Sequence, residues 1–436
     1  MTAEIAILNR EAVALASDSA ATIATEPISK IFPSANKIFT LSKFCPVGIM
    51  IYGNASFMGI PWETIIKIYR NKLSENESSH LGDYAKAFLD FLDNGNPLFP
   101  ETVQDAHVSE TAHAYFNLIK EQIENKVNQK IEDSDMIDKK GIKSIVEEIL
   151  NNHAEVWDRS NNIPNIPAKF FDEVSTKYKT IINTAFDDTF EKLPLSQKNS
   201  ALIKKFSVYC LTKLSAALTN EKRSGIVVAG FGKDDVFPAV MSYDLETILN
   251  NRLKYREGTT GKIDFKNGAA VIPFAQSEMV STFMDGIDPK YREIIESYVE
   301  NVFMEYSKIM VNKLKNYTDM EKTELEKKFV EASQKIVEDL SVKLTKYQRA
   351  YHSSPIVDIV AILPKDELAA MAESLVNLTS FKRRVTPESE TVGGPIDVAV
   401  ITKGDGFIWI KRKHYFKAEL NPQFRENYYR GCTKYE

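Results

Sequence analysis

The second residue of the chain is a threonine, and this position gives it chemistry that an internal threonine lacks. Thr2 is small, so an aminopeptidase could remove Met1 and expose it as the N-terminus. It would then carry a hydroxyl nucleophile and an α-amine that takes up the hydroxyl proton, the pairing used by N-terminal threonine enzymes. An α-amine has a pKa of about 7.7–8.0, which suits proton transfer near neutral pH. Many inactive proteins also carry threonine at this position, so Thr2 needs partners.

Short strands are the elements that would hold Thr2. Residues 1–8 and 13–19 alternate or run apolar around the polar turn Asn9–Glu11, which predicts a hairpin that brings Asp18 back beside Thr2. A loop is expected from Ser19 to Pro33. Further strands are expected at 37–41, 47–52, 225–231, 236–243, 269–274, 396–402 and 407–411.

Two stretches between these strands are helical in pattern. Residues 105–222 carry amphipathic, charged segments, and residues 289–350 read as two long helices rich in Lys and Glu. The order strands, helices, strands, helices, strands favours two sheets sandwiched by helices over a doubly wound sheet. We therefore expect an α+β fold whose strand-rich core is interrupted twice. Its segments are core in 1–104, 223–288 and 353–436, a helical insertion in 105–222, and a helical arm in 289–352.

Composition narrows the function classes. The net charge of -5 and pI near 5.9 argue against a general nucleic-acid-binding surface. No stretch approaches the roughly 20 apolar residues that span a bilayer, and no signal peptide is visible. Three widely spaced cysteines fit a reducing compartment, so a cytoplasmic protein without membrane contact is expected. The histidines show no metal-ligand spacing, and no metal or organic cofactor is expected.

Several segments together resemble a known family. Residues 2–55, with the stretches VALASDSAAT, NKIF and YGNAS, are similar to the start of proteasome β-type subunits and their bacterial ring-protease relatives. Those proteins are N-terminal nucleophile (Ntn) hydrolases with a four-layer αββα sandwich. The resemblance continues in Val227–Phe231, in Phe274–Glu278 and in VGGPIDVAVITKGDGFIWI at 392–410, and covers roughly half the chain. It implies an Ntn-type sandwich enlarged by the two helical insertions.

The resemblance also implies roles for five residues. Thr2 would be the nucleophile, Asp18 and Lys37 the ion pair beside it, Gly53 the backbone oxyanion donor, and Ser277 a neighbour of the threonine amine. A nearby ammonium lowers the cost of forming an alkoxide, and a carboxylate keeps that ammonium charged. One oxyanion donor is worth roughly 2.7–4 kcal/mol. The implied activity is cleavage of peptide or amide bonds in a peptide or protein substrate, by a homo-oligomer that an ATPase could assist.

The chain departs from the family before its glycine pair. Val392 stands where the family has a serine, and Ser389 stands at or near an aspartate position, with Glu388 and Glu390 as stand-ins. Two alternatives therefore stay open. One is an inactive structural or assembly subunit that keeps the sandwich as a scaffold; the other is a small-molecule amidase of the same superfamily.

Overall fold

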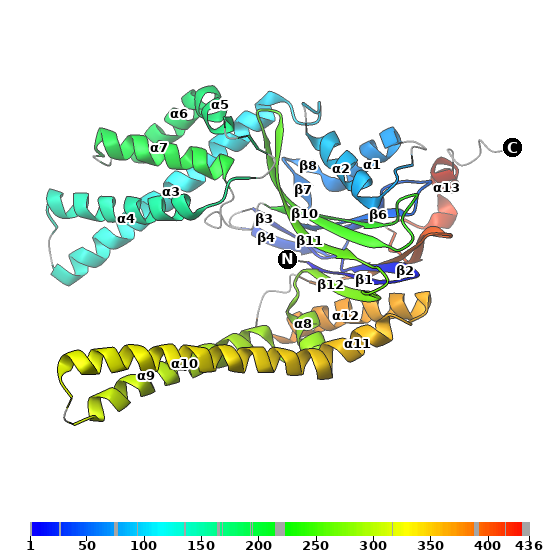
Figure 1. Ribbon diagram of the computed structural model, residues 1–436. Helices are drawn as coiled ribbons and strands as arrows, with labels where there is room; N and C mark the ends of the chain where they lie inside the picture. Colours follow the sequence, from blue (N-terminus) through cyan, green and yellow to red (C-terminus); the bar gives the residue numbers. More distant parts are fainter. Residues whose placement is uncertain are drawn as a thin grey trace.

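The protein combines antiparallel sheets with a larger share of helix. The computed structural model describes residues 2–25, 28–73, 77–93, 95–134, 137–163, 166–167, 169–191, 193, 195–213, 223–315, 317–387, 392–414 and 416–429. Helices account for 56% and strands for 21% of the structure, and the strands pair antiparallel, as the α+β class predicts. The helical share is larger than the strand share because two helical extensions project from the strand-rich centre (Figure 1).

Two five-stranded sheets form that centre. The first has the order β12-β1-β2-β13-β14, and the second has the order β11-β10-β9-β6-β5. The strands of the first sheet are β1 (Ala3–Asn9), β2 (Ala12–Ser17), β12 (Ala269–Ala275), β13 (Asp397–Thr402) and β14 (Gly406–Lys411). Those of the second are β5 (Ile38–Thr40), β6 (Val47–Gly53), β9 (Ser224–Gly230), β10 (Ala239–Leu249) and β11 (Arg252–Lys262).

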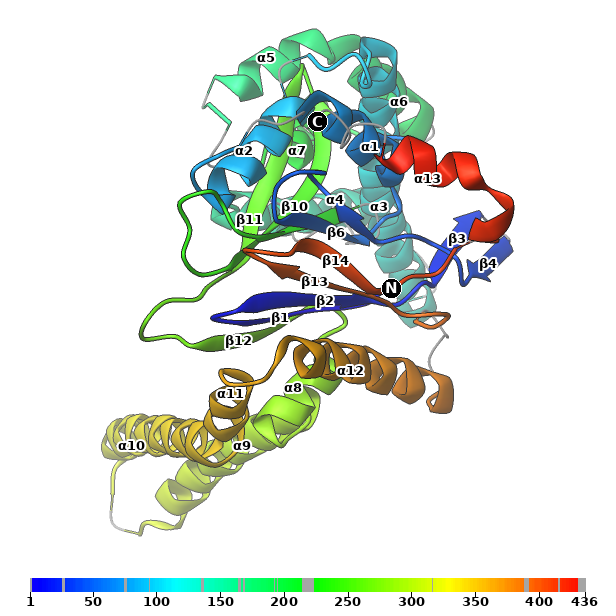
Figure 2. The same cartoon turned by 90° about the vertical axis from the view of Figure 1, so that its right-hand side faces the viewer.

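The sheets pack face to face and are covered by helices on their outer faces (Figure 2). Successive side chains of a strand point to opposite faces, so one set from each strand fills the space between the sheets. Ala6, Leu8 and Leu15 of the first sheet meet Met50 and Val227 of the second there. The outer face of the first sheet packs against α8 (Glu278–Asp285), α11 (Ser354–Val360) and α12 (Lys365–Val385).

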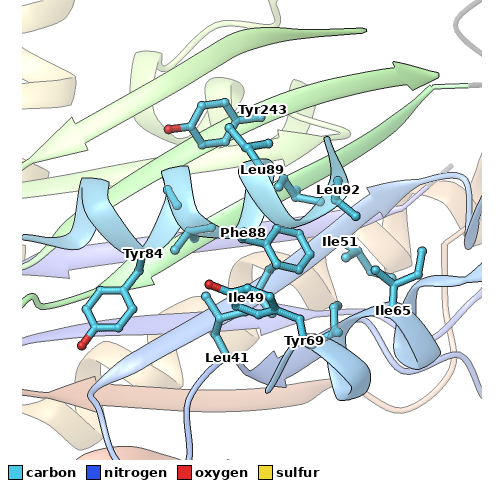
Figure 3. Close-up of a cluster of buried hydrophobic side chains, with 14 of the residues drawn as sticks. Leu41, Ile49, Ile51, Ile65, Tyr69, Tyr84, Phe88, Leu89, Leu92 and Tyr243 are labelled. Atoms are coloured by element: carbon cyan, nitrogen blue, oxygen red, sulfur yellow. The ribbon is translucent and has the colours of Figure 1, made fainter. Parts of the chain in front are cut away.

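The outer face of the second sheet is covered by α1 (Trp62–Leu73) and α2 (Leu81–Leu92). Figure 3 shows this layer, with Phe88 of α2 and Ile65 of α1 near Ile49 and Ile51 of β6. Phe88 also meets Tyr69 edge to face, with ring centroids 5.0 Å apart. Burying such side chains contributes roughly 1.5–3 kcal/mol each, so this layer holds β6, which leads directly to Gly53.

The first helical extension has a core of its own. Tyr115, Trp157 and Phe206 are buried in it, and the Tyr115 hydroxyl accepts a hydrogen bond from the Trp157 indole N–H at 2.7 Å. The helices are α3 (Glu101–Ser134), α4 (Lys139–Arg159), α5 (Phe170–Lys177), α6 (Lys179–Phe190) and α7 (Gln197–Thr212). Helix α3 begins four residues before the expected start of the insertion at 105.

The second extension is an arm of two long helices, α9 (Pro289–Lys313) and α10 (Asp319–Gln348). Ser307 and Val311 of α9 and Ser333 of α10 are the buried side chains among the described residues of the arm. The Ser307 and Ser333 hydroxyls lie 3.0 Å apart and share a hydrogen bond. Both extensions point to the side of the sheets on which the chain starts (Figure 1), whereas α13 (Pro422–Tyr429) lies on the other side.

The loop expected from Ser19 to Pro33 is wrong. This segment forms a hairpin of β3 (Ala21–Thr25) and β4 (Ile28–Phe32), because each residue of one strand finds a backbone partner on the other. A second short hairpin, β7 (Ser56–Phe57) with β8 (Ile60–Pro61), precedes α1. The expected final hairpin at 396–402 and 407–411 is confirmed as β13 and β14.

Candidate active site

Thr2 lies at one end of the space between the two sheets. It is 4% exposed and directly precedes β1, and its carbonyl accepts a hydrogen bond from the Gln276 N–H at 3.1 Å. The Thr2 hydroxyl oxygen Oγ1 faces the second sheet, where the Gly53 N–H is directed at it over 3.5 Å, a long hydrogen bond. The reactive oxygen of the predicted nucleophile therefore has a backbone donor from the opposite sheet.

Asp18 is the most fully bonded side chain of the site. The register of β1 and β2 pairs Glu4 with Ser17, so the predicted hairpin returns Asp18 directly beside Ala3, one residue after Thr2. One carboxylate oxygen, Oδ1, accepts from the Ala3 N–H at 3.0 Å and from the Lys37 ammonium at 2.7 Å. The other, Oδ2, accepts from the backbone N–H groups of Ala20 at 3.1 Å and Gly393 at 3.0 Å.

The Lys37 ammonium reaches this carboxylate from the second sheet. The side chains of Lys37 and Asp18 are 7% and 0% exposed, so the ion pair is desolvated and its geometry is restricted. Because Lys37 shares Oδ1 with the Ala3 N–H, its ammonium lies beside the backbone that joins Thr2 to Ala3. The Lys37 carbonyl accepts from the Ile51 N–H at 2.9 Å, which ties the lysine to β6.

Gly53 is in a backbone conformation that other residues adopt at a cost. Its φ is +79°, and a Cβ atom there would lie 2.4 Å from the Arg223 carbonyl oxygen. The neighbouring Asn54 N–H donates to that same oxygen at 3.1 Å. The backbone of Arg223 therefore fixes the turn that directs the Gly53 N–H toward Thr2. A donor in this position can stabilise an oxyanion that forms next to Oγ1.

Ser277 is apart from this group. Its side chain is exposed, and it opens α8 without forming a side-chain cap. Within the described part of the chain, no hydrogen bond joins Ser277 to Thr2, Asp18 or Lys37. The link to this segment is made by its neighbour Gln276, through the Thr2 carbonyl. The structure thus brings Thr2, Asp18, Lys37 and Gly53 together and leaves the Ser277 hydroxyl outside.

The glycine pair also reaches the site. In addition to the Gly393 contact with Asp18, the Gly393 carbonyl accepts from the Ser19 N–H at 3.0 Å. Val392 is 5% exposed and packs in the core against α12. A valine side chain brings no hydroxyl to the site. Glu388, Ser389 and Glu390 lie outside the described residues.

Three charged residues that the sequence analysis missed lie close to the predicted set. Glu4 and Asp397 flank Ser17 on the neighbouring strands β1 and β13, and each is 2% exposed. Lys413 forms an ion pair with Asp397, and its backbone N–H donates to the same carboxylate at 2.8 Å. Burial lowers the pKa of Lys413, although Asp397 raises it. Glu4 and Asp397 are each an isolated acid in an otherwise apolar strand, and Lys413 lies after the last strand, so the sequence alone does not mark any of the three as part of the site.

The described residues contain no group of three or more His, Cys, Asp or Glu side chains arranged to hold a metal ion. None of their helices is long and apolar enough to cross a membrane.

No protein-family model matches the chain, and no curated protein matches it either. The function must therefore be inferred from the site.

Proposed function

We propose that this protein is an N-terminal threonine hydrolase that cleaves peptide or amide bonds after Met1 has been removed. One observation supports this proposal above the others: the Thr2 hydroxyl faces the Gly53 N–H, while the Asp18–Lys37 pair is bonded to the next residue, Ala3. These are the groups that the chemistry needs, namely a nucleophile, an oxyanion donor and a fixed positive charge.

In the proposed reaction the free Thr2 α-amine takes the proton from Oγ1, and Oγ1 attacks the scissile carbonyl carbon. The carbonyl oxygen becomes an oxyanion and accepts the Gly53 N–H. The amine returns the proton to the leaving nitrogen, the C–N bond breaks, and an acyl ester remains on Oγ1. Water, deprotonated by the same amine, then hydrolyses the ester and restores Thr2. In every step the Lys37 ammonium offsets the developing negative charge, and Asp18 keeps this ammonium charged and oriented.

The layered sheets are consistent with an Ntn-hydrolase sandwich of the proteasome β type, which we propose as the fold family. The two sheets with helices on both outer faces, and an N-terminal threonine at one end between them, support it. We further propose a cytoplasmic homo-oligomer acting on peptides or proteins, with an ATPase as an optional partner. The exposed apolar face of the arm supports self-association.

One observation favours the scaffold alternative. Val392 is a buried apolar residue where the family has a serine, and Ser277 makes no hydrogen bond to Thr2 within the described residues. A subunit that lacks amine-holding groups could keep the fold for assembly alone. Mass spectrometry of the intact protein separates the two functions, because a retained Met1 blocks the amine and favours the scaffold.

The proposed function is tested by turnover of a fluorogenic peptide library by wild type, Thr2→Ala and Thr2→Ser. We expect Thr2→Ala to fold normally and to lose all turnover, because it lacks the attacking oxygen. Thr2→Ser keeps a hydroxyl and an amine and should retain measurable activity. Equal turnover by wild type and Thr2→Ala would exclude the mechanism.

A further inference from the structure

Glu4 is a buried acid in the site, and one of its carboxyl oxygens has no hydrogen-bond partner among the residues that the structure describes. Its side chain lies on the same face of β1 as Ala6 and Leu8, which fill the space between the sheets. The Ser17 hydroxyl lies 3.4 Å from its Oε1, but this hydroxyl has a single proton and donates to the nearer Asp18 carbonyl oxygen at 3.0 Å. Its Oε2 is buried and has no hydrogen-bond partner within the described structure.

The contrast with Asp18 indicates which carboxyl carries the negative charge. Asp18 accepts four hydrogen bonds, one of them from the Lys37 ammonium, whereas the carboxyl of Glu4 has, within the described residues, only the 3.4 Å contact with the Ser17 hydroxyl. Burial raises the pKa of Glu4 well above its usual range; Lys37 opposes this rise, and Asp18 adds to it. An ionised Glu4 would leave an unpaired negative charge in the core, which is strongly unfavourable.

The charged and titratable groups that act on Glu4 come from both sheets. Lys37 precedes β5, Asp18 follows β2, and Tyr52 lies at the end of β6. Tyr52 donates to Asp244 at 2.8 Å, and burial together with Asp244 raises its pKa, so it stays neutral. The Asp397–Lys413 pair lies one strand further, across Ser17. Lys37 is therefore the cation that an ionised Glu4 would attract.

We infer that Glu4 is a positioning residue, held as an uncharged acid behind Thr2, and that its neutrality keeps the Lys37 ammonium paired with Asp18 alone. This inference rests on the proposed function. If Glu4 loses its proton, Lys37 gains a second carboxylate, is held more tightly and offsets less of the charge that develops on Oγ1. Activity should then have an upper pH limit that is set by Glu4.

The test compares wild type with Glu4→Gln, which is neutral at every pH and close in shape. The matched control is Glu11→Gln, because Glu11 is an exposed acid in the turn of the same hairpin. The readout is the rate at which an N-terminal-threonine-directed electrophile labels Thr2 from pH 6 to 10. Above its maximum the wild-type rate should fall by about tenfold per pH unit, and Glu11→Gln should do the same. The labelling rate of Glu4→Gln should stay within about twofold of its own maximum over the same pH range. Coinciding profiles, or a wild-type rate that does not fall, would overturn the inference.

Two measurements on the same proteins do not depend on activity. Infrared spectra at pH 7 should contain the carbonyl stretch of a protonated carboxyl in wild type that Glu4→Gln lacks. A folded-state pKa above the unfolded value stabilises the fold at low pH, and this contribution is lost as the pH rises toward the folded pKa. Glu4→Gln should therefore melt higher than wild type at pH 8.5, with a smaller difference at pH 4.5. If both signals are absent, the inference that Glu4 is uncharged is wrong. Both signals without any labelling of Thr2 would instead overturn the proposed function.

Discussion

Gly53 joins the second sheet to Thr2 through its backbone, and its conformation can be tested separately from its position. Gly53→Ala forces a Cβ atom against the Arg223 carbonyl at a positive φ, so the turn must shift and the N–H must move away from Oγ1. We expect a loss of about 1–2 kcal/mol of stability from the backbone conformation. Activity should fall by about 10²–10³-fold, the cost of one oxyanion donor. Peptide turnover and thermal unfolding check both.

Gly59 provides the matched control. Its φ is +83°, close to that of Gly53, but a Cβ atom there meets nothing within 4 Å. Gly59→Ala should therefore lose a similar amount of stability through the positive φ and keep the peptide turnover of wild type. If the two variants lose activity equally, the role assigned to the Gly53 N–H is wrong.

At the scale of residues, some members of the site can be predicted from the sequence and others cannot. Asp18 could be predicted from the residues alone, because a hairpin with a short polar turn returns it to Thr2. Lys37 and Gly53 could be predicted only through the resemblance, since the contact between two sheets is not encoded in local spacing. Glu4 could not be predicted, because an isolated acid in an alternating strand usually indicates the solvent-facing side.

At the scale of elements, apolar strands and amphipathic helices were predictable and polar strands were not. β1, β2, β6, β9 and β13 carry continuous or alternating apolar residues, and each lies close to its expected range. β11 has the sequence RLKYREGTTGK and is an edge strand with most of its side chains exposed, so no apolar pattern indicates it. Pro27 lies between β3 and β4, and Pro33 directly follows β4. Prolines at these positions favour a loop prediction, although the two strands pair with each other and form a hairpin.

Among the described residues, helix α9 of the arm presents a row of exposed apolar side chains. Tyr291, Ile294, Tyr298, Val302 and Tyr306 of α9 are exposed and three or four residues apart, so they share one helix face. Exposed apolar patches of this extent usually mark interaction sites. The arm carries both signs of charge along its length, so two copies can approach without strong repulsion.

We therefore expect light scattering to give the mass of at least two chains, each of 49.3 kDa. The double variant Tyr298→Glu with Tyr306→Glu places charge on the apolar face and should shift the protein toward the monomer. Lys328→Glu, which changes the exposed charges around Glu324 and leaves the apolar face as it is, should leave the mass unchanged. A monomeric wild type, or a double variant that associates like wild type, would contradict self-association through the arm.

The central claim is that the exposed N-terminal threonine is the nucleophile. The most direct measurement is reaction of the purified protein with an N-terminal-threonine-directed electrophile, followed by peptide mass spectrometry to locate the adduct. The account predicts a single adduct on Thr2 in chains that lack Met1, and none in Thr2→Ala. Chains that lack Met1 but stay unlabelled at Thr2, or an adduct on another residue that persists in Thr2→Ala, would contradict it.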